Sequence, residues 1–402
     1  MSDSLLSYRP FVQLLAARVL AGAATQMTMV AAAWQMYQLT GSALDLGLVG
    51  LLQFLPVLVF TLPAGHVADR YHRARVIAAA QSLLLAAAAV LLAASAGGAL
   101  SRELLFGVSV LLGTARTFQA PAQQSMVPSL VPPSLLARAM AMSSGGNQVA
   151  VIGGPALAGL LFLGSGTAVY ALAALMLLGA MVAVLRLQDR RVVSTDPPTL
   201  HAMLAGVRFV WQRKTLLGAV SLDLMAVLFG GATALLPIFA QDVLHVGPAG
   251  LGALRSAPAV GALLVSLALA RFPIRVRVGR WLLLSVAAYG VCMLVFGLST
   301  TFWLSLLALA LSGGFDMVSV VVRQTLVQMD TPDAMRGRVG AVNSMFIGAS
   351  NQLGEFESGV TAALLGAVGS VVLGGVATLA IVAAWSRLFP GLAQRQRFEE
   401  GG

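Results

Sequence analysis

The stretch GHVADRYHRAR, residues Gly65–Arg75, lies between two long apolar runs at 46–63 and 76–96. It contains three arginines and one aspartate, and such side chains are costly to place in lipid hydrocarbon. We therefore expect a short cationic loop at a membrane face, with Gly65 allowing the backbone to turn tightly. Asp69 has a short side chain, so we expect it to bond a backbone end or a neighbouring arginine.

The composition of the whole chain agrees with a membrane location. The 402 residues are 58% hydrophobic and 10% charged, whereas soluble domains carry roughly 25% charged residues. The net charge of +10 does not indicate nucleic-acid binding, because the arginines lie at the ends of apolar runs and form no basic face. The single cysteine, Cys292, lies in an apolar run, so neither a disulfide framework nor a metal cluster is expected.

Apolar runs long enough to span a bilayer recur along the chain, since a spanning helix needs about 20 residues. We predict an all-α membrane protein with twelve transmembrane helices in two pseudo-symmetric six-helix bundles. The predicted spans are 11–38, 46–66, 75–97, 102–127, 137–164, 167–187, 214–241, 250–271, 279–299, 302–327, 337–365 and 369–388. The first run is too long for a signal-peptide core and lacks a small-residue cleavage pattern.

Cationic residues are strongly biased to one side of this topology. An even number of spans places both termini on the same side, and most cations of the connections fall there. They are Arg70, Arg73, Arg75, Arg138, Arg190, Arg191, Arg213, Lys214, Arg271, Arg275, Arg277, Arg280, Arg336, Arg338, Arg395 and Arg397. The opposite connections hold Arg102 and almost no other cation. The positive-inside rule then predicts that both termini are cytoplasmic.

The two halves of the chain repeat each other at an offset of 200 residues. The match includes Gln124-Ser125-Met126-Val127 with Gln324-Thr325-Leu326-Val327, and Gly113 and Gly159 with Gly313 and Gly359. We predict an N-terminal bundle at 1–187, a cytoplasmic linker at 188–213 and a C-terminal bundle at 214–402. The linker contains Pro197-Pro198 and a helical apolar pattern from Leu200 to Trp211. This pattern fits an amphipathic helix on the membrane surface or a solvated linker helix equally well.

The pattern G-x-x-x-D-R-x-x-R in the opening stretch resembles the loop between helices 2 and 3 of the major facilitator superfamily. That resemblance implies a gating loop, in which an aspartate helps hold a gate shut by charge contacts with a neighbouring helix. The residues concerned are Gly65, Asp69, Arg70, Arg73 and Arg75. The alternative is an ordinary positive-inside loop with no gating role.

Three further stretches resemble the enterobactin-exporter-like branch of this superfamily, which includes macrolide and multidrug effluxers. They are Gln328–Arg338, Leu39–Leu48 and Pro121–Gln124. A fourth stretch, Gly153–Gly159, resembles the Gly-Pro helix of drug–proton antiporters, with Ala158 in place of one glycine. Its residues Gly154, Pro155 and Gly159 form the predicted helix-packing motif. Small residues there allow close helix approach and the proline bends the helix, so generic packing is the alternative explanation.

Ionisable residues inside membrane helices are rare and usually face a cavity or a partner. In this chain they fall in predicted helices 1, 4, 7, 10 and 11, whereas the interiors of helices 3, 6, 9 and 12 are suited to lipid. The resemblance implies the same division between cavity-lining and outer helices. The predicted substrate and proton cavity comprises Arg18, Gln26, Arg116, Asp223, Asp316, Glu355 and Glu357.

Several of these residues allow two interpretations. Arg116 and Asp316 are repeat equivalents, and they form either a midplane substrate or proton site or a structural ion pair. Asp223 is either a proton-carrying acid or a helix-entry residue. Glu355 and Glu357 point about 200° apart on a helix, so only one of them can face a given cavity. Gln26 belongs to a polar stripe or serves core hydrogen bonding.

The sequence carries no motif for ATP binding and no catalytic set, so we predict a transporter rather than an enzyme. No metal site or cofactor is expected, and the proton gradient is the predicted energy source. The expected protein is a monomeric exporter of a siderophore or a lipophilic drug in the bacterial inner membrane, working by alternating access and proton antiport. The alternative is a facilitator or importer with the same fold and no proton coupling.

Overall fold

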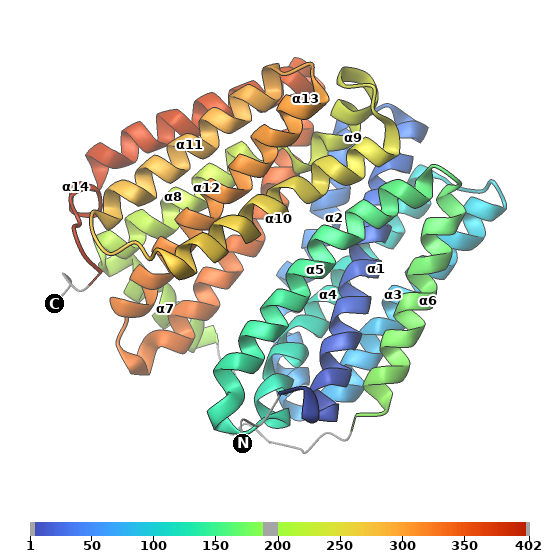
Figure 1. The fold of residues 1–402 in the computed structure, drawn as a ribbon, viewed down its shortest axis with the longest axis horizontal. Helices are drawn as coiled ribbons and strands as arrows, with labels where there is room; N and C mark the ends of the chain where they lie inside the picture. The colour runs from blue at the N-terminus through green and yellow to red at the C-terminus, as the bar shows by residue number, and fades with distance from the viewer. Residues whose placement is uncertain (1–4, 188–199, 399–402) are drawn as a thin grey trace. The chain divides into compact units, whose positions relative to one another are not determined.

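The computed structural model describes residues 5–187 and 200–398, and this part of the chain is helical throughout, with short connections (Figure 1). The long helices are α1 (Arg9–Thr40), α2 (Ala43–Arg70), α3 (Arg73–Ala96), α4 (Arg102–Leu130), α5 (Leu136–Phe162), α6 (Gly166–Leu185), α7 (Leu200–Gln212), α8 (Lys214–Gly230), α10 (Gly247–Arg271), α11 (Val278–Leu298), α12 (Phe302–Met329) and α13 (Asp333–Leu388). The short elements are η1 (Leu5–Ser7), η2 (Pro133–Leu135), η3 (Thr233–Leu235), α9 (Leu236–Ile238), η4 (Phe239–Val243) and α14 (Pro390–Ala393).

Ten helical segments in the described residues are long and apolar enough to cross a membrane. Two features account for the difference from the twelve predicted spans. The helix α4 is 29 residues long but is not among the ten. The helix α13 counts once, although Gly366 (φ 77°, ψ 163°) interrupts its 56 residues where the sequence predicted two spans. The left-handed φ at this position favours glycine, which therefore marks the connection between the two arms.

The predicted cationic loop at Gly65–Arg75 is much shorter in the structure, so the predicted bounds are wrong. The helix α2 continues through Gly65 to Arg70, and α3 begins at Arg73, so only Tyr71 and His72 lie between them. The helix continues past the end of its apolar run. Outside the hydrocarbon layer a helix can carry polar side chains, so the end of the apolar run does not mark the end of the helix. A cation in the last turn, here Arg70, is also favourable for the helix dipole.

The chain forms two compact units. Unit 1 comprises Met1–Gly41, Leu51–Pro198 and Gly247–Ser256, and unit 2 comprises Ser42–Gly50, Thr199–Val246 and Ala257–Gly402. The first turns of α2 thus group with unit 2, and the first turns of α10 group with unit 1. The predicted boundary at 188–213 stays a prediction, and residues 188–199 lie outside the described part.

In unit 1, α1 packs against α5 and α6, and α3 packs against α4 and α6. Close packing is possible because the buried positions of α1 and α3 are rich in alanine, including Ala17, Ala21 and Ala24 on α1. The buried Tyr170 on α6 donates its hydroxyl hydrogen to Gln35 on α1. A buried phenol needs such a partner, so this bond helps fix α6 on α1.

In unit 2, α8 packs against α13, and α11 packs against both α12 and α13. Its core contains Leu222 of α8, Val278 and Leu282 of α11, and Val322 and Leu326 of α12. A second core cluster joins α7 through Val210 to Val327 and Val339. The predicted linker helix therefore exists and is attached to unit 2, with Trp211 exposed.

The predicted repeat is reflected in the packing of each unit. A Cβ atom on Gly113 of α4 would collide with the backbone of Gln53 on α2, inside unit 1. A Cβ atom on the repeat-equivalent Gly313 of α12 would collide with the backbone of Pro258 on α10, inside unit 2. Both positions need glycine because the two helices approach too closely for any side chain.

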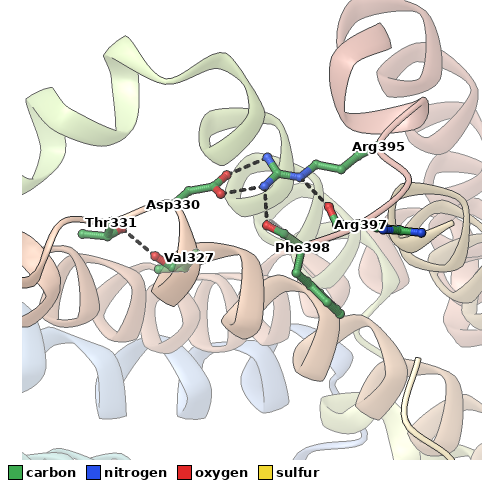
Figure 2. A network of polar contacts seen from close by, with 6 residues as sticks. All are labelled: Val327, Asp330, Thr331, Arg395, Arg397 and Phe398. Carbon is green, nitrogen blue, oxygen red and sulfur yellow. Dashed lines mark hydrogen bonds and ion pairs between the residues drawn. The ribbon is translucent and has the colours of Figure 1, made fainter. Parts of the chain in front are cut away.

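The C-terminal segment holds one end of unit 2 together, and we call Leu392–Phe398 the C-terminal clamp. Arg395 donates two hydrogen bonds, of 2.7 and 2.8 Å, to the carboxylate of Asp330 at the end of α12 (Figure 2). It also donates to the carbonyls of Phe398 (2.7 Å) and Arg397 (3.1 Å). The backbone N–H of Gly279, in the first turn of α11, donates to the carbonyl of Arg395 at 3.1 Å. The clamp therefore ties the start of α11 to the end of α12.

Candidate functional site

A buried ion pair connects three helices inside unit 2. Arg323 on α12 lies 3.1 Å from a carboxylate oxygen of Asp223 on α8, and its side chain is 1% exposed. A second guanidinium nitrogen donates to Asn343 Oδ1 on α13 at 2.8 Å. Removing a charge from water costs several kcal/mol unless the charge is paired and hydrogen-bonded. Asp223 and Asn343 each bind one terminal nitrogen of Arg323, whereas its Nε has no hydrogen-bond partner among the described residues.

A small cavity lies beside this pair, entirely within unit 2. Its polar lining comes from Asp223, Tyr289, Asp316 and Ser319, which lie on α8, α11 and α12; the apolar lining is Ala226, Val227 and Val286. The structure thus brings together Asp223 and Asp316, which the sequence assigned to one cavity. Two carboxylates and one guanidinium in one buried region can hold an exchangeable proton or a polar ligand group.

The end of α8 gives this cavity its shape. The helix stops at Gly230, and the Tyr289 hydroxyl donates to the Gly230 carbonyl at 2.8 Å. This bond satisfies one of the carbonyls that a helix end leaves without an intrahelical partner. A Cβ atom on Gly230 would lie 2.7 Å from the Tyr289 ring, so only glycine fits there.

Four members of this site are missing from the predicted set, namely Arg323, Tyr289, Ser319 and Asn343. Arg323 is an ionisable residue inside predicted helix 10, but the predicted cavity does not include it. Tyr289 lies in a run that the sequence assigned to lipid, so that assignment is incomplete for α11. The signal for Tyr289 is a phenolic hydroxyl in a largely apolar span, and such a group needs a partner.

The remaining cationic and amide residues of the predicted cavity belong to unit 1. Arg116 on α4 is exposed within this unit, and its guanidinium lies 3.8 Å from the sulfur of Met29 on α1. Arg18 and Gln26 are half-buried on α1. Arg116 and Asp316 belong to different units, so their proposed pairing stays a prediction.

The two glutamates of α13 lie near the part of α2 that groups with unit 2. A Cβ atom on Gly50 would lie 2.8 Å from Glu355 Oε2, so the Glu355 carboxylate lies against α2 at this glycine. Glu357 is half-buried, and its backbone carbonyl accepts a 3.0 Å hydrogen bond from Thr361. Glu355 is therefore the glutamate whose carboxylate contacts a neighbouring helix.

The residues of the predicted gating loop are partly described. Arg73 donates to the carbonyl of Ser125 on α4 at 2.8 Å, which links the start of α3 to α4 within unit 1. Arg70 and Arg75 are exposed. The Asp69 side chain lies outside the described part, and its gating role stays a prediction.

The predicted packing motif lies on α5, at two close helix crossings. A Cβ atom on Gly154 would lie 2.8 Å from the Ala23 carbonyl of α1, and one on Gly159 would lie 3.1 Å from Gly252 Cα. Ser256 on α10 donates to the Ile152 carbonyl at 2.8 Å. These contacts all lie inside unit 1 and explain why small residues are needed there.

Comparisons with known proteins agree with this architecture. A family model described as a transmembrane secretion effector matches residues 4–394. The enterobactin exporter EntS of Citrobacter koseri is 27% identical over 85% of this chain and 81% of its own. The corresponding protein of Escherichia coli O1:K1 is 28% identical over the same shares.

Solved structures share the fold at low sequence identity. The nucleoside transporter NupG aligns with a TM-score of 0.73 and 15% identity, over 94% of this chain and 99% of its own. A bacterial homolog of the human lysosomal transporter Spinster aligns with a TM-score of 0.75 and 17% identity, over 98% and 99% of the two chains. The chain therefore belongs to the transmembrane secretion effector family and is a transporter of the major facilitator superfamily, not an enzyme.

Proposed function

We propose that this transporter exports a small molecule, a siderophore or a lipophilic drug, across the bacterial inner membrane by alternating access and proton antiport. The observation that supports export as the direction of transport is the match to relatives named as enterobactin exporters. That match extends over 85% of the chain. The family description, a secretion effector, favours the same direction over import.

The cavity of unit 2 is the proposed proton site. Asp223 is paired with Arg323, whereas Asp316 makes no ion pair within the described residues. When both aspartates are ionised, the three side chains carry one net negative charge. A proton on Asp316 removes that charge, so we assign the exchangeable proton to Asp316. Asp223 and Arg323 hold the neighbouring charges in place.

The cationic residues of unit 1 favour an anionic or oxygen-rich substrate. Arg18 is half-buried on α1 and Arg116 is exposed on α4, so both guanidinium groups can donate hydrogen bonds to oxygen atoms of a substrate. Guanidinium forms planar, paired hydrogen bonds to such groups. A catecholate siderophore of enterobactin's kind fits this chemistry better than an uncharged drug does.

The arginine bias of the connections supports an orientation with both termini in the cytoplasm, and we propose that the monomer is the transporting unit. Fusions of a reporter enzyme that is active only outside the cytoplasm test the orientation. A fusion at residue 398 should be inactive, and a fusion after Gly98, between α3 and α4, should be active. The reverse pattern would overturn the orientation.

Expression in a bacterial strain that lacks its own exporters tests the function. We expect restored secretion of a catecholate siderophore, higher tolerance of lipophilic drugs, or both. A matched control is Glu103→Gln, because Glu103 is an exposed acid in the first turn of α4. If neither secretion nor tolerance changes while uptake of some solute increases, the protein is an importer or facilitator instead.

A further inference from the structure

Four arginines gather at the connection between α10 and α11, in unit 2. They are Arg271, Arg275, Arg277 and Arg280, and all four are exposed. None of them makes an ion pair with another residue that the structure describes. We call this set the arginine patch. Four cations within ten residues repel one another, so a bound anion would stabilise the arrangement.

The arginine patch is held rigidly by the core and by the C-terminal clamp. Ile274 packs against the core of unit 2, and Val278 is fully buried. The N–H groups of Val278 and Gly279 donate to the carbonyls of Gln396 and Arg395, at 3.4 and 3.1 Å. A fixed backbone reduces the conformational freedom that the patch loses on binding, which favours affinity for a ligand.

One residue of the patch has an unfavourable backbone conformation. Arg277 has φ 56° and ψ 38°, in the left-handed region that residues other than glycine seldom adopt. Such strain persists only where the surroundings impose it, and it is frequent at ligand-binding positions. Glycine would adopt this backbone conformation with less strain than arginine does. The fold alone therefore does not explain why an arginine occupies this position.

The neighbouring side chains place the patch at the level of lipid headgroups. Phe272, which follows the first arginine of the patch, is 72% exposed, and Trp281, which follows the last, is 48% exposed. The Arg271 guanidinium lies 5.4 Å from the centre of the Phe272 ring. Exposed aromatic rings beside cations are typical of the membrane–water interface.

The connection between α10 and α11 differs in sequence from its first-half counterpart, the connection between α2 and α3. The difference favours a fixed binding surface in the second half. At an offset of 205 residues, which aligns Gln53 with Pro258, Arg70 and Arg75 correspond to Arg275 and Arg280. Asp69 corresponds to Ile274, and Arg73 corresponds to Val278. The second-half connection has thus replaced its acid and one cation by core residues and has kept the exposed arginines.

We propose that the arginine patch binds the phosphate of an anionic phospholipid headgroup. Guanidinium groups bind phosphate through paired, charge-assisted hydrogen bonds, and the exposed aromatic rings contact the upper part of the acyl chains. The occupant is a lipid rather than free phosphate, because the surface combines cations with apolar rings.

Native mass spectrometry of the purified full chain, titrated with phosphatidylglycerol, tests this proposal. We expect phosphatidylglycerol to bind, phosphatidylcholine to bind much more weakly and inorganic phosphate not to displace the lipid. The double variant Arg275→Gln/Arg280→Gln should bind about thirtyfold more weakly, since each surface arginine contributes roughly 1 kcal/mol toward anionic lipid. The matched control, Arg70→Gln/Arg75→Gln, removes the same charge from the first-half connection and should have a clearly smaller effect.

A second variant separates ligand binding from fold stability. Arg277→Gly removes a patch cation and relieves the left-handed strain, so it should raise the melting temperature without lipid while weakening phosphatidylglycerol binding. Equal losses in the two double variants, equal binding of both lipids, displacement by inorganic phosphate or unchanged binding by Arg277→Gly would each overturn the proposal.

Discussion

Arg323 and Asp223 form an ion pair of 3.1 Å between α12 and α8, and it lies beside a cavity that also contains the carboxylate of Asp316. The pair neutralises one acid of the cavity and leaves the other available. We therefore propose different roles for the two aspartates, in which Asp223 holds the buried guanidinium and Asp316 exchanges a proton.

Breaking this pair from one side should be more harmful than removing both partners. Asp223→Asn leaves Arg323 buried without its ion-pair partner, and breaking a buried pair from one side costs about 3–5 kcal/mol. The double variant Asp223→Asn/Arg323→Gln should recover much of that loss. Thermal melting of the detergent-purified protein compares Asp223→Asn, Arg323→Gln and the double variant. Additive effects of the two single substitutions would show that the pair is not coupled.

The close helix crossing at Gly313 should tolerate no side chain. Gly313→Ala would force α12 away from the Pro258 backbone, so we expect lower yield and a lower melting temperature. Gly107→Ala on α4 is the matched control, because its Cβ would meet no atom within 4 Å. Alanine should even favour that helix, by about 1 kcal/mol. Equal behaviour of the two variants would contradict the close crossing of α10 and α12.

The C-terminal clamp should stabilise unit 2 through Arg395 and hardly at all through Arg397. Arg395→Gln removes two bonds to Asp330, which is a buried, bidentate charge pair. Arg397→Gln removes an equal charge from an exposed position. We expect a lower melting temperature only for Arg395→Gln, and a comparable loss for Asp330→Asn. A clamp with no structural role would leave both melting temperatures at the wild-type value.

Asp69→Asn should slow transport while leaving the amount of protein in the membrane unchanged. This expectation comes from the resemblance of Gly65–Arg75 to a gating loop, in which the acid makes charge contacts with a neighbouring helix. Transport assays with quantified membrane protein test it, with Glu103→Gln as the control acid. Unchanged transport would leave this region as an ordinary positive-inside connection.

The sequence predicts the membrane helices well because hydrophobic length decides them, and all predicted spans coincide with helical segments of the structure. It predicts their ends poorly. The helix α2 continues to Arg70, beyond its apolar run, because helical hydrogen bonding does not stop where the hydrocarbon ends. The position at which α13 divides into two arms is seen from the backbone angles of Gly366. The presence of a glycine in the sequence does not by itself specify those angles.

The candidate site was predicted in part. Asp223 and Asp316 were found because charged residues inside membrane spans are costly and therefore conspicuous. Their neighbours Arg323 and Tyr289 were not predicted, because the partner of a buried acid depends on which helices pack together. Arg323 lies 100 residues after Asp223, and Tyr289 lies on a span that is largely apolar. Neither proximity follows from spacing along the chain.

The central claim is that Asp316 carries the proton exchanged for substrate, and proton flux in sealed vesicles tests it most directly. Purified protein is reconstituted with a pH-sensitive dye, and substrate is added on one side. We predict substrate-dependent proton movement for the wild type and for Glu103→Gln. For Asp316→Asn we predict that this movement is lost, while substrate exchange without a proton gradient continues. Substrate-dependent proton flux in Asp316→Asn at the wild-type rate would contradict the account.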